Sequence, residues 1–324
     1  MRAVICRAYG PPEDLVVEEV ASPTPGPGQV VVSVKACGVN FPNTLIIRGL
    51  YQFKPALPFS PGNEVAGIVK QVGEGGATVK PGDRVIAFGL VGGFAEEMLA
   101  EADAVLRMPP TMNYETAASL VMTYGTSLHA LKDRAQLQPG ETLLVLGAAG
   151  GIGLAAVELG KAMGARVIAA ASSDEKLAIC RQHGADAVIN YRNEALKERI
   201  QALTARQGVD VVVDPVGGAH SELALRATAW NGRFLVIGFT AGEIPRIPLN
   251  LPLLKGCSIV GVFWGSFAAR HPRQNQENLR ALLGWFEAGK LRPRIGARYP
   301  LERAADALND LLQRKVTGKA VLLV

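Results

Sequence analysis

The stretch LLVLGAAGGIGLAA, from Leu143 to Ala156, decides the fold of this chain. It starts as a continuously apolar strand, passes through a turn of Gly and Ala residues, and runs directly into a helical pattern. Small residues in such a turn let the main chain approach a pyrophosphate, and the helix N-terminus supplies free N–H donors with partial positive charge. The sequence therefore predicts a dinucleotide-binding turn formed by Ala149, Gly150, Gly151 and Ile152.

This turn departs from the usual GxGxxG pattern at its first position, where the chain has Ala148. A glycine pattern alone is weak evidence, but one that lies between a strand and a helix and is followed by a second strand is far more specific. The alternative is a tight strand–helix turn that binds no ligand. Gly153 serves helix packing under either interpretation.

Further apolar strands alternate with helical segments after this turn. Together with the first strand, they are expected at residues 142–147, 166–171, 187–190, 209–214, 233–238 and 258–263. Strands that are continuously apolar and separated by helices are typical of a parallel sheet covered on both faces. We expect this doubly wound, dinucleotide-binding domain to span residues 125–264.

The first third of the chain is different, because short strands there are separated by many Gly and Pro residues. These strands are expected at residues 29–36, 64–72 and 84–88. Their pattern predicts an antiparallel, partly open barrel. Two late helices and a last strand, KAVLLV, are expected to return and complete this domain, which would then comprise residues 1–124 and 265–324.

Composition and charge fit a soluble protein that acts on small molecules. The chain has 324 residues, of which 19% are charged, with a formal net charge of +5. The positive charges are dispersed, so a nucleic-acid surface is not expected, and no uncharged stretch reaches the ~18 residues that a membrane span needs. The four cysteines lie far apart and the N-terminal MRAVICRAYG is no secretory signal, so we expect reduced thiols and a cytoplasmic protein.

The end of the second apolar strand indicates which dinucleotide is bound. Sites for NAD usually end this strand with an acidic residue that binds the ribose hydroxyls, but this chain has Ala171 there. Ser172 and Lys176 follow closely, and Tyr191 follows the third strand. Hydroxyls and a lysine without a competing carboxylate favour a 2′-phosphate, so the sequence predicts NADPH as the cofactor.

Two other interpretations of these residues stay open. Lys176 can be a solvated charge on a helix face, and Ser172 can cap that helix, with Glu175 completing a capping box. Asp174 is a further complication, because a small rotation would let its carboxylate bind the ribose of NADH.

Several stretches resemble the medium-chain dehydrogenase/reductase superfamily, and within it the zinc-free NADPH:quinone oxidoreductases, a zeta-crystallin-like family. They include ACGVNFPNTLIIRGLY, LPFSPGNEVAGIVKQVGEG, KPGDRVIAF, MTYGTSLHAL, GADAVINYR and VDVVVDPVGG, and they occur in order along nearly the whole chain. The resemblance implies a GroES-like barrel domain joined to a Rossmann NADP-binding domain, with the active site in the cleft between them.

The resemblance also implies that no metal is bound. Zinc-dependent relatives carry a ligating Cys where this chain has Asn40, and Gly-His-Glu where it has Gly62, Asn63 and Glu64. A neutral amide is a poor substitute for a thiolate or an imidazole around zinc. Glu64 is therefore expected to order the start of its strand through hydrogen bonds, with a nearby Arg as a candidate partner.

The same resemblance assigns roles to further residues. It implies that Asn40 donates a hydrogen bond near the nicotinamide and the substrate oxygen, that Tyr51 donates a hydrogen bond or a proton there, and that Thr123 lies at the nicotinamide end. Asn40 and Thr123 can instead be capping residues, and Tyr51 an ordinary barrel aromatic. Cofactor contacts are implied at Gly238, Phe239 and Phe263.

Without zinc no Lewis acid polarises a simple carbonyl, so the hydride acceptor must already be electron-poor. A quinone is the expected acceptor. Leu45 and Asn43 replace a tyrosine and an aspartate of several family members, which makes a conjugated C=C bond in an enone, alkenal or 2-enoyl compound the alternative. A third possibility is a crystallin-like structural or RNA-binding protein that retains the NADPH site. The apolar segment CSIVGVFWG predicts a sheet edge that pairs two copies into a homodimer or homotetramer.

Overall fold

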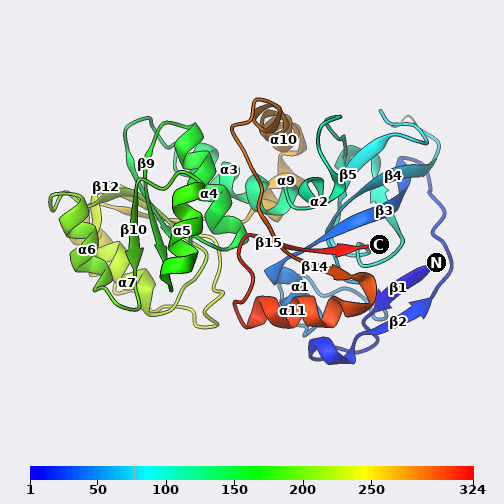
Figure 1. Cartoon of the computed structure of the whole chain (residues 1–324), viewed down its shortest axis with the longest axis horizontal. Helices are drawn as coiled ribbons and strands as arrows, with labels where there is room; N and C mark the ends of the chain where they lie inside the picture. Colours follow the sequence, from blue (N-terminus) through cyan, green and yellow to red (C-terminus); the bar gives the residue numbers. More distant parts are fainter. Residues whose placement is uncertain (76–77) are drawn as a thin grey trace. The chain divides into compact units, whose positions relative to one another are not determined.

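The computed structural model describes residues 1–75 and 78–324, and these fall into two compact units (Figure 1). Unit 1 comprises Met1–Met122 and Pro293–Val324, and unit 2 comprises Thr123–Arg292. Each unit has its own sheet and its own core.

Residues 265–292, which we expected in the first domain, belong to unit 2. Helix α10 (Pro272–Glu287) carries Asn278, whose side chain accepts a hydrogen bond from Lys132 Nζ at 2.7 Å and donates one to Asp133 at 2.9 Å. These bonds tie α10 to the helical segment that opens unit 2, which explains the difference.

Unit 1 is built around strand β3 (Gln29–Val39), to which three other strands are paired. Its seven-stranded sheet has the order β14-β15-β3-β4-β5-β7, with β6 also paired to β3. The other strands are β4 (Glu64–Val72), β5 (Arg84–Phe88), β6 (Glu97–Glu101), β7 (Val105–Arg107), β14 (Ile295–Pro300) and β15 (Lys319–Leu323). Among the described residues, the strand pairs of this sheet are antiparallel except β14 with β15, which confirms the barrel-like domain expected here.

Short elements surround this sheet. They are β1 (Arg2–Ile5), η1 (Pro12–Asp14), β2 (Val16–Glu19), α1 (Phe41–Ile46), η2 (Ala102–Ala104), α2 (Tyr114–Ala117), η5 (Leu301–Arg303) and α11 (Ala304–Leu312). Val30, Val32 and Val34 of β3 point into a core that α11 closes with Ala307 and Leu308. This core fixes the position of the strand ends that carry the polar cluster described below.

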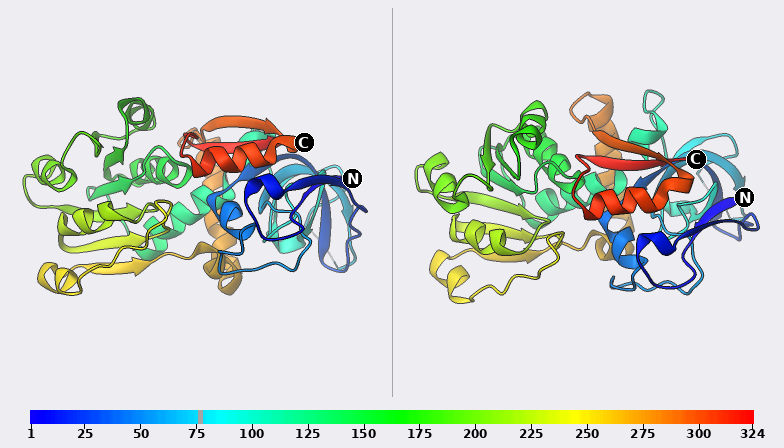
Figure 2. Two further views of the ribbon diagram at one scale, coloured as in Figure 1. Left: turned by 90° about the horizontal axis from the view of Figure 1, so that it is seen from below. Right: turned by 60° about the horizontal axis from the view of Figure 1, so that its bottom comes forward.

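The last strand, β15, brings a distant residue beside the start of α1. It pairs antiparallel with β3 so that Ala320 lies opposite Val39. The residue before it, Lys319, reaches the side chain of Asn40, the residue after Val39. Both views in Figure 2 show the red β15 running beside the orange β14, with which it pairs in parallel.

Unit 2 is built on a six-stranded parallel sheet in the order β10-β9-β8-β11-β12-β13. The strands are β8 (Thr142–Leu146), β9 (Arg166–Ala171), β10 (Ala187–Asn190), β11 (Val209–Asp214), β12 (Thr228–Val236) and β13 (Ser258–Gly261). Leu143, Leu144, Val145 and Leu146 of β8 are all fully buried, as a strand covered on both faces requires. The strand order reverses between β8 and β11, and ligands of such folds bind outside the carboxyl ends of the strands at this point.

Helical segments precede, connect and follow these strands (Figure 1). They are η3 (Val121–Gly125), α3 (Thr126–Leu128), η4 (His129–Arg134), α4 (Gly151–Ala162), α5 (Asp174–Gln182), α6 (Leu196–Leu203), α7 (Ala219–Arg226), α8 (Asn250–Lys255) and α9 (Trp264–Arg270), followed by α10. In the described part of the chain, every helix is too short or too polar to span a bilayer.

Candidate functional site

The turn between β8 and α4 has the backbone geometry that the sequence predicts for a phosphate site. Gly147 has a φ of +57°, and Gly150 is the N-cap of α4, with no side chain to satisfy the first N–H groups of the helix. A Cβ on Gly153 would lie only 2.4 Å from the Gly147 carbonyl oxygen, so the first turn of α4 can pack here only without one. The free N–H groups of Gly151 and its neighbours can therefore receive an anionic group.

The residues predicted to recognise the 2′-phosphate follow neighbouring strands. Ser172 comes directly after β9 and Tyr191 directly after β10, and the Tyr191 backbone N–H donates to the Ala171 carbonyl at 3.2 Å. Lys176 lies on α5, and all three predicted residues are half-buried. They thus lie at the carboxyl ends of adjacent strands, where a ribose phosphate would be bound.

Helix α5 is capped by Ser173 and not by Ser172. The Ser173 hydroxyl accepts a hydrogen bond from the Lys176 backbone N–H at 3.4 Å, and its interaction with Glu175 lowers the pKa of that carboxyl. The cap lies one residue later because the chain stays extended through Ser173. The Ser172 hydroxyl therefore does not serve as the cap of this helix.

Asp174, the candidate partner of an NADH ribose, is engaged elsewhere. Its carboxylate accepts a hydrogen bond from Asn190 Nδ2 at 2.9 Å. Rotation toward a ribose would break this bond between α5 and β10, which weakens the NADH interpretation.

Gly238 and Phe239 lie beside the loop that follows β11. The backbone N–H of Gly238 approaches the carbonyl of Asp214, the last residue of β11, at 3.4 Å. A Cβ on Gly217 would lie 2.9 Å from the Phe239 ring, so this ring rests against the same loop. Phe263, which follows β13, is 53% exposed.

Asp214 was not identified from the sequence, although it organises this loop. Its carboxylate accepts hydrogen bonds from the N–H groups of Val216 and Gly217 at 2.8 and 2.9 Å and from the Ser221 hydroxyl at 2.5 Å. An aspartate at the end of a buried strand and before Pro-Val-Gly-Gly was the available signal. Its role is to shape the carboxyl end of β11.

His220 is a second residue that sequence reasoning missed. Its ring lies 4.3 Å from the ring of Tyr191, and burial lowers its pKa. Its Nδ1 is enclosed and makes no hydrogen bond with the described residues. A lone histidine on a helix gave no sequence signal for this position.

A buried polar cluster lies in unit 1, at the ends of β3, β4 and β15. Lys319 Nζ donates to Asn40 Oδ1 and to Glu64 Oε1, each at 2.6 Å, and Lys319 and Glu64 are 4% and 0% exposed. The second carboxylate oxygen, Glu64 Oε2, accepts the Met122 backbone N–H at 2.9 Å. Removal of one partner of such a buried pair typically costs about 3–5 kcal/mol.

Glu64 therefore has the ordering role that was expected, but its partner is Lys319 and not an arginine. The sequence could not identify this partner, because 255 residues separate the two. The available signal was the lysine that opens the apolar strand KAVLLV.

Asn40 also bonds to its neighbouring amides. Its Nδ2 donates to Asn63 Oδ1 at 3.0 Å and to Glu64 Oε1 at 2.9 Å, while Asn43 Nδ2 lies 3.4 Å from the same Asn63 oxygen. Asn43 Oδ1 accepts the Asn40 backbone N–H at 2.7 Å, which fixes the first turn of α1. Both N–H groups of the Asn40 amide thus donate hydrogen bonds within the protein. The family resemblance instead implied that one of them donates to the substrate.

The other two residues in implied catalytic roles lie in different units. Tyr51 belongs to unit 1, packs half-buried against its core, and has a hydroxyl whose pKa is raised by burial. Thr123 opens unit 2 within the π-helical segment η3 and is 4% exposed.

The described residues offer no metal centre of His, Cys, Asp or Glu. Within residues 1–75 and 78–324, no three such side chains are grouped closely enough to hold an ion. Cys180 and His183 share a face of α5, but burial raises the pKa of the thiol to about 12, and His183 Nδ1 lies 2.5 Å from Glu158 Oε1.

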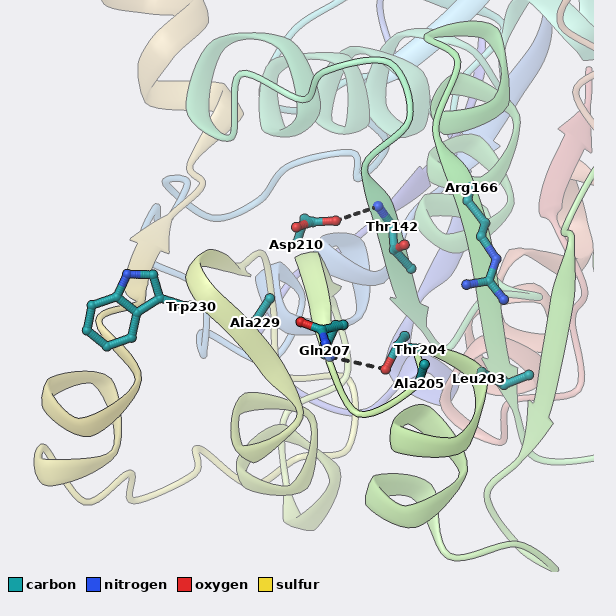
Figure 3. Close-up of a pocket in the computed structure, with 10 residues that line it drawn as sticks. Thr142, Arg166, Leu203, Thr204, Ala205, Gln207, Asp210, Ala229 and Trp230 are labelled. Atoms are coloured by element: carbon teal, nitrogen blue, oxygen red, sulfur yellow. Dashed lines mark hydrogen bonds between the residues drawn. The ribbon is translucent and has the colours of Figure 1, made fainter.

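A pocket lies at the amino ends of the unit 2 strands, opposite the end that carries the phosphate turn (Figure 3). Its lining includes Thr142, Arg166 and Asp210, which lie at or near the amino ends of β8, β9 and β11, together with the exposed Trp230. It is therefore separate from the phosphate turn at the carboxyl ends.

Comparison with known proteins agrees with this architecture. Residues 26–110 match the family model described as an alcohol dehydrogenase GroES-like domain, and residues 151–286 match the model described as a zinc-binding dehydrogenase. A quinone oxidoreductase-like protein 2 homologue from Nematostella vectensis is 42% identical over 99% of this chain and 88% of its own length.

Two solved structures are similar over the whole chain. The Escherichia coli quinone oxidoreductase in complex with NADPH has a TM-score of 0.93 and 29% identity, and covers 100% of both chains. A mycobacterial protein, Rv1454c, also in complex with NADPH, has a TM-score of 0.94 and 30% identity with the same coverage. With this likeness along its full length, the chain belongs to the quinone oxidoreductase family of medium-chain dehydrogenase/reductases.

Proposed function

We propose that this protein is an NADPH-dependent oxidoreductase that reduces quinones without zinc. The observation that carries the proposal is the Lys319 ammonium, which lies 2.6 Å from both Asn40 Oδ1 and Glu64 Oε1. Zinc-dependent relatives are expected to hold their metal beside the residues equivalent to Asn40 and Asn63. Here the oxygen atoms are already bonded, and a second cation would be repelled by the ammonium.

The turn at Ala149, Gly150, Gly151 and Ile152 fits the pyrophosphate of the cofactor. NADPH is preferred to NADH, because β9 ends at Ala171 without a carboxylate and Ser172, Lys176 and Tyr191 lie around the expected 2′-phosphate. The two relatives with bound NADPH support this assignment. Gly238, Phe239 and Phe263 are proposed as further contacts to the cofactor.

When bound, the reduced nicotinamide supplies a hydride, which is two electrons with one proton. The acceptor then gains negative charge on its carbonyl oxygen, and a second proton from solvent or from Tyr51 completes its reduction. The chain contributes hydrogen-bond donors held in place before the reaction, which stabilise this charge more effectively than mobile water does. Thr123 is proposed to help orient the nicotinamide.

A conjugated C=C bond is a second candidate acceptor. Asn43 is 1% exposed and bonded within the polar cluster, so its amide is not available to line a polar pocket. Leu45, where several relatives have tyrosine, is half-buried and apolar. These two residues favour an apolar enone or 2-enoyl compound beside the quinone.

We propose that the protein is located in the cytoplasm. The four cysteines are unpaired and buried, which supports a reducing compartment. Small molecules are the proposed substrates, and neither a membrane nor a nucleic acid is a proposed partner.

Oxidation of NADPH with a panel of acceptors tests the function. We expect turnover with 9,10-phenanthrenequinone and 1,4-benzoquinone, and slower turnover with an alkenal and an enoyl thioester. Faster turnover of the enoyl thioester would favour the second candidate. Oxidation of simple alcohols with NADP⁺, and no reduction of any panel member, would contradict both candidates.

Zinc independence is tested on the same preparation. Elemental analysis should find no stoichiometric zinc in the active protein, and dialysis against a chelator should leave quinone reduction unchanged. Loss of activity that is restored by Zn²⁺ would refute the proposed mechanism.

A further inference from the structure

Lys319 fixes the orientation of the amides around it. An ammonium can only donate hydrogen bonds, so the Asn40 atom that faces it at 2.6 Å must be the carbonyl oxygen. The Asn40 nitrogen then faces Asn63 and Glu64, and the Asn63 atom that receives its hydrogen at 3.0 Å must also be an oxygen. Lys319 thus fixes the orientation of the Asn40 amide, and Asn40 in turn fixes the orientation of the Asn63 amide.

This sequence of bonds leaves the Asn63 nitrogen without a protein partner. Asn63 Oδ1 accepts from Asn40 and Asn43, but Nδ2 donates to none of the described residues. The residue is only 6% exposed. Within residues 1–75 and 78–324, the enclosed side-chain atoms without partners are Glu97 Oε2 and His220 Nδ1, so Asn63 Nδ2 still reaches accessible space.

The other donors of the cluster are bonded within it. The two hydrogens of Asn40 Nδ2 go to Asn63 and Glu64, and Lys319 Nζ donates to Asn40 and Glu64. Asn43 Nδ2 faces Asn63 Oδ1 at 3.4 Å, and Asn43 and Lys319 are only 1% and 4% exposed, less than Asn63. Asn63 is in addition held by its backbone, since its carbonyl accepts the Gly89 N–H at 3.0 Å. A ligand oxygen that reaches this cluster therefore finds Asn63 Nδ2 as its ready donor.

We propose that Asn63 Nδ2 donates the hydrogen bond to the carbonyl oxygen of the hydride acceptor, and that Lys319 and Asn40 act as positioning residues for it. This inference rests on the proposed function, because it names the residue that stabilises the oxygen of a quinone or an enone. It differs from the family-based expectation, in which Asn40 itself donates to the substrate.

The buried charge also strengthens this donor. The ammonium polarises the Asn40 amide through Oδ1, and the Asn40 N–H in turn polarises the Asn63 amide through its own Oδ1. Hydrogen bonds in such a series reinforce one another in a low-dielectric interior. Through this polarisation, the positive charge of Lys319 strengthens the hydrogen bond that Asn63 donates to the acceptor's carbonyl oxygen. That oxygen becomes negative during hydride transfer, and the chain stabilises it without a metal ion.

The substitution Asn63→Asp gives the sharpest test. It keeps the size of the side chain and the oxygen that accepts from Asn40 and Asn43. At neutral pH it replaces the donor with a second carboxylate oxygen and adds a negative charge, which Asn63→Ala does not. We expect kcat for 9,10-phenanthrenequinone to fall about 100-fold, as is typical when a single oxyanion donor is removed. The affinity for NADPH, measured by its fluorescence, should stay unchanged.

The pH profile separates a donor role from a structural one. A protonated Asp side chain is again a donor, so the activity of Asn63→Asp should rise as the pH falls, whereas that of Asn63→Ala should stay low. Equal profiles for the two variants would overturn the proposal. Asn275→Asp is a matched control, because Asn275 is 3% exposed and its Oδ1 accepts the Trp264 indole N–H, a bond that a carboxylate retains.

A readout independent of turnover is the C=O stretch of ¹³C-labelled 9,10-phenanthrenequinone bound with NADP⁺. A hydrogen bond from Asn63 should lower this frequency in the native protein, and both Asn63 variants should lose the shift. An unchanged frequency and an unchanged kcat in both variants would overturn the role of Asn63 while quinone reduction by the native protein still stands.

The same measurement remains decisive if the proposed function fails. A native protein that reduces no panel member would remove the proposed function, and the C=O frequency would still show whether Asn63 binds the oxygen. A native protein that does not bind the quinone at all would overturn both.

Lys319 is tested in a double variant, because Lys319→Met alone leaves Glu64 as an unpaired buried charge. Lys319→Met with Glu64→Gln removes both charges and frees the Asn40 amide to flip. We expect a broadened C=O band and about a tenfold loss of kcat with little change in KM, and Lys319→Arg should retain most of the native behaviour. A sharp native-like band in the double variant would exclude Lys319 as a positioning residue.

Discussion

Lys176 is the single side chain on which the preference for NADPH depends most. It lies half-buried in the first turn of α5, five residues after the end of β9. We predict that Lys176→Ala weakens NADPH binding about tenfold, the lower end of what one lysine–phosphate interaction contributes, and changes NADH binding little. Titration of the nucleotide fluorescence measures both affinities.

Arg181→Ala provides the matched control for this prediction. Arg181 is an exposed cation on the same helix, so its loss changes the net charge equally but removes no proposed phosphate contact. A similar loss of affinity for NADPH and NADH in Lys176→Ala would show that this lysine does not contact the 2′-phosphate.

For single residues, the sequence predicted the chemistry of a side chain better than it predicted the residue to which that side chain is hydrogen-bonded. The amides of Asn40 and Asn63 could be recognised as poor zinc ligands, since ligand chemistry depends on the residue itself. Lys319 could not be recognised, because its place opposite Asn40 depends on the register of β15 with β3. The position of a helix cap was likewise wrong by one residue, since both Ser172 and Ser173 have the required hydroxyl.

The strand–turn–helix element around β8 and α4 depends on close backbone packing. A Cβ on Gly153 would approach the Gly147 oxygen at 2.4 Å and Ala148 Cα at 2.6 Å. We predict that Gly153→Ala lowers the free energy of unfolding by about 1–3 kcal/mol and weakens NADPH binding. Urea unfolding and nucleotide titration measure the two effects.

Gly284→Ala is the control for this element. Gly284 lies within α10, and a Cβ there would meet no heavy atom within 4 Å. Alanine should therefore raise the free energy of unfolding by up to about 1 kcal/mol, the difference in helix propensity. Similar destabilisation by both substitutions would show that the packing around Gly153 is not the cause.

A partly buried ion pair joins β12 to the start of β8. Arg233 donates two hydrogen bonds to the Glu141 carboxylate, at 2.8 and 2.7 Å. Burial alone raises the pKa of Glu141, but the bonds from Arg233 and from the Gln138 backbone N–H outweigh it and hold the pKa below its usual value. Because the folded state binds this proton less tightly than the unfolded state, the pair stabilises the fold above the unfolded pKa and not below the folded one.

We predict that Glu141→Gln lowers the free energy of unfolding by about 1–2 kcal/mol at neutral pH. The difference from the native protein should shrink as the pH falls below about 4. Urea unfolding at several pH values measures it. Glu222→Gln, which breaks the exposed pair with Arg226, should have little effect at any pH, and a pH-independent difference for Glu141→Gln would contradict the ion-pair explanation.

The sequence located most elements of both sheets, because each strand is short, apolar and bounded by turn residues. Strands β4, β5, β9, β10 and β11 have the bounds that the sequence predicts. Strand β12 begins earlier than expected because Thr228 already pairs with Val209 of β11. A shift in register follows, and it contains Asn231 in a left-handed conformation. Helix α10 is one of the two late helices that the sequence predicts, whereas α9 was not predicted. That α10 belongs to unit 2 is reflected in the bonds of Asn278, which no periodicity reveals.

At the scale of the whole molecule, β13 predicts association of two copies. It is the edge strand of the unit 2 sheet, with Ile259 40% exposed and Phe263, just after it, 53% exposed. We predict a homodimer or homotetramer that Ile259→Lys dissociates, because a charge on an edge strand opposes pairing. Light scattering gives the mass, and Val17→Lys, a 41% exposed position on β2, is the matched control.

A monomeric native protein would remove this prediction without touching the proposed chemistry. The same mass in native protein and in Ile259→Lys, both above that of one chain, would instead place the subunit contact away from β13.

The pairing of Lys319 with Glu64 also bears on how the protein is made. A ribosome must add 255 residues after Glu64 before the lysine exists, which takes roughly 13 to 50 s at usual rates of synthesis. All of unit 2 is synthesised within that interval, as an insertion within unit 1, and most of it can fold first. Until then the sheet around β3 lacks one neighbour and its carboxylate lacks a counter-charge, so translation products that stop after unit 2 should be recognised as incomplete and degraded.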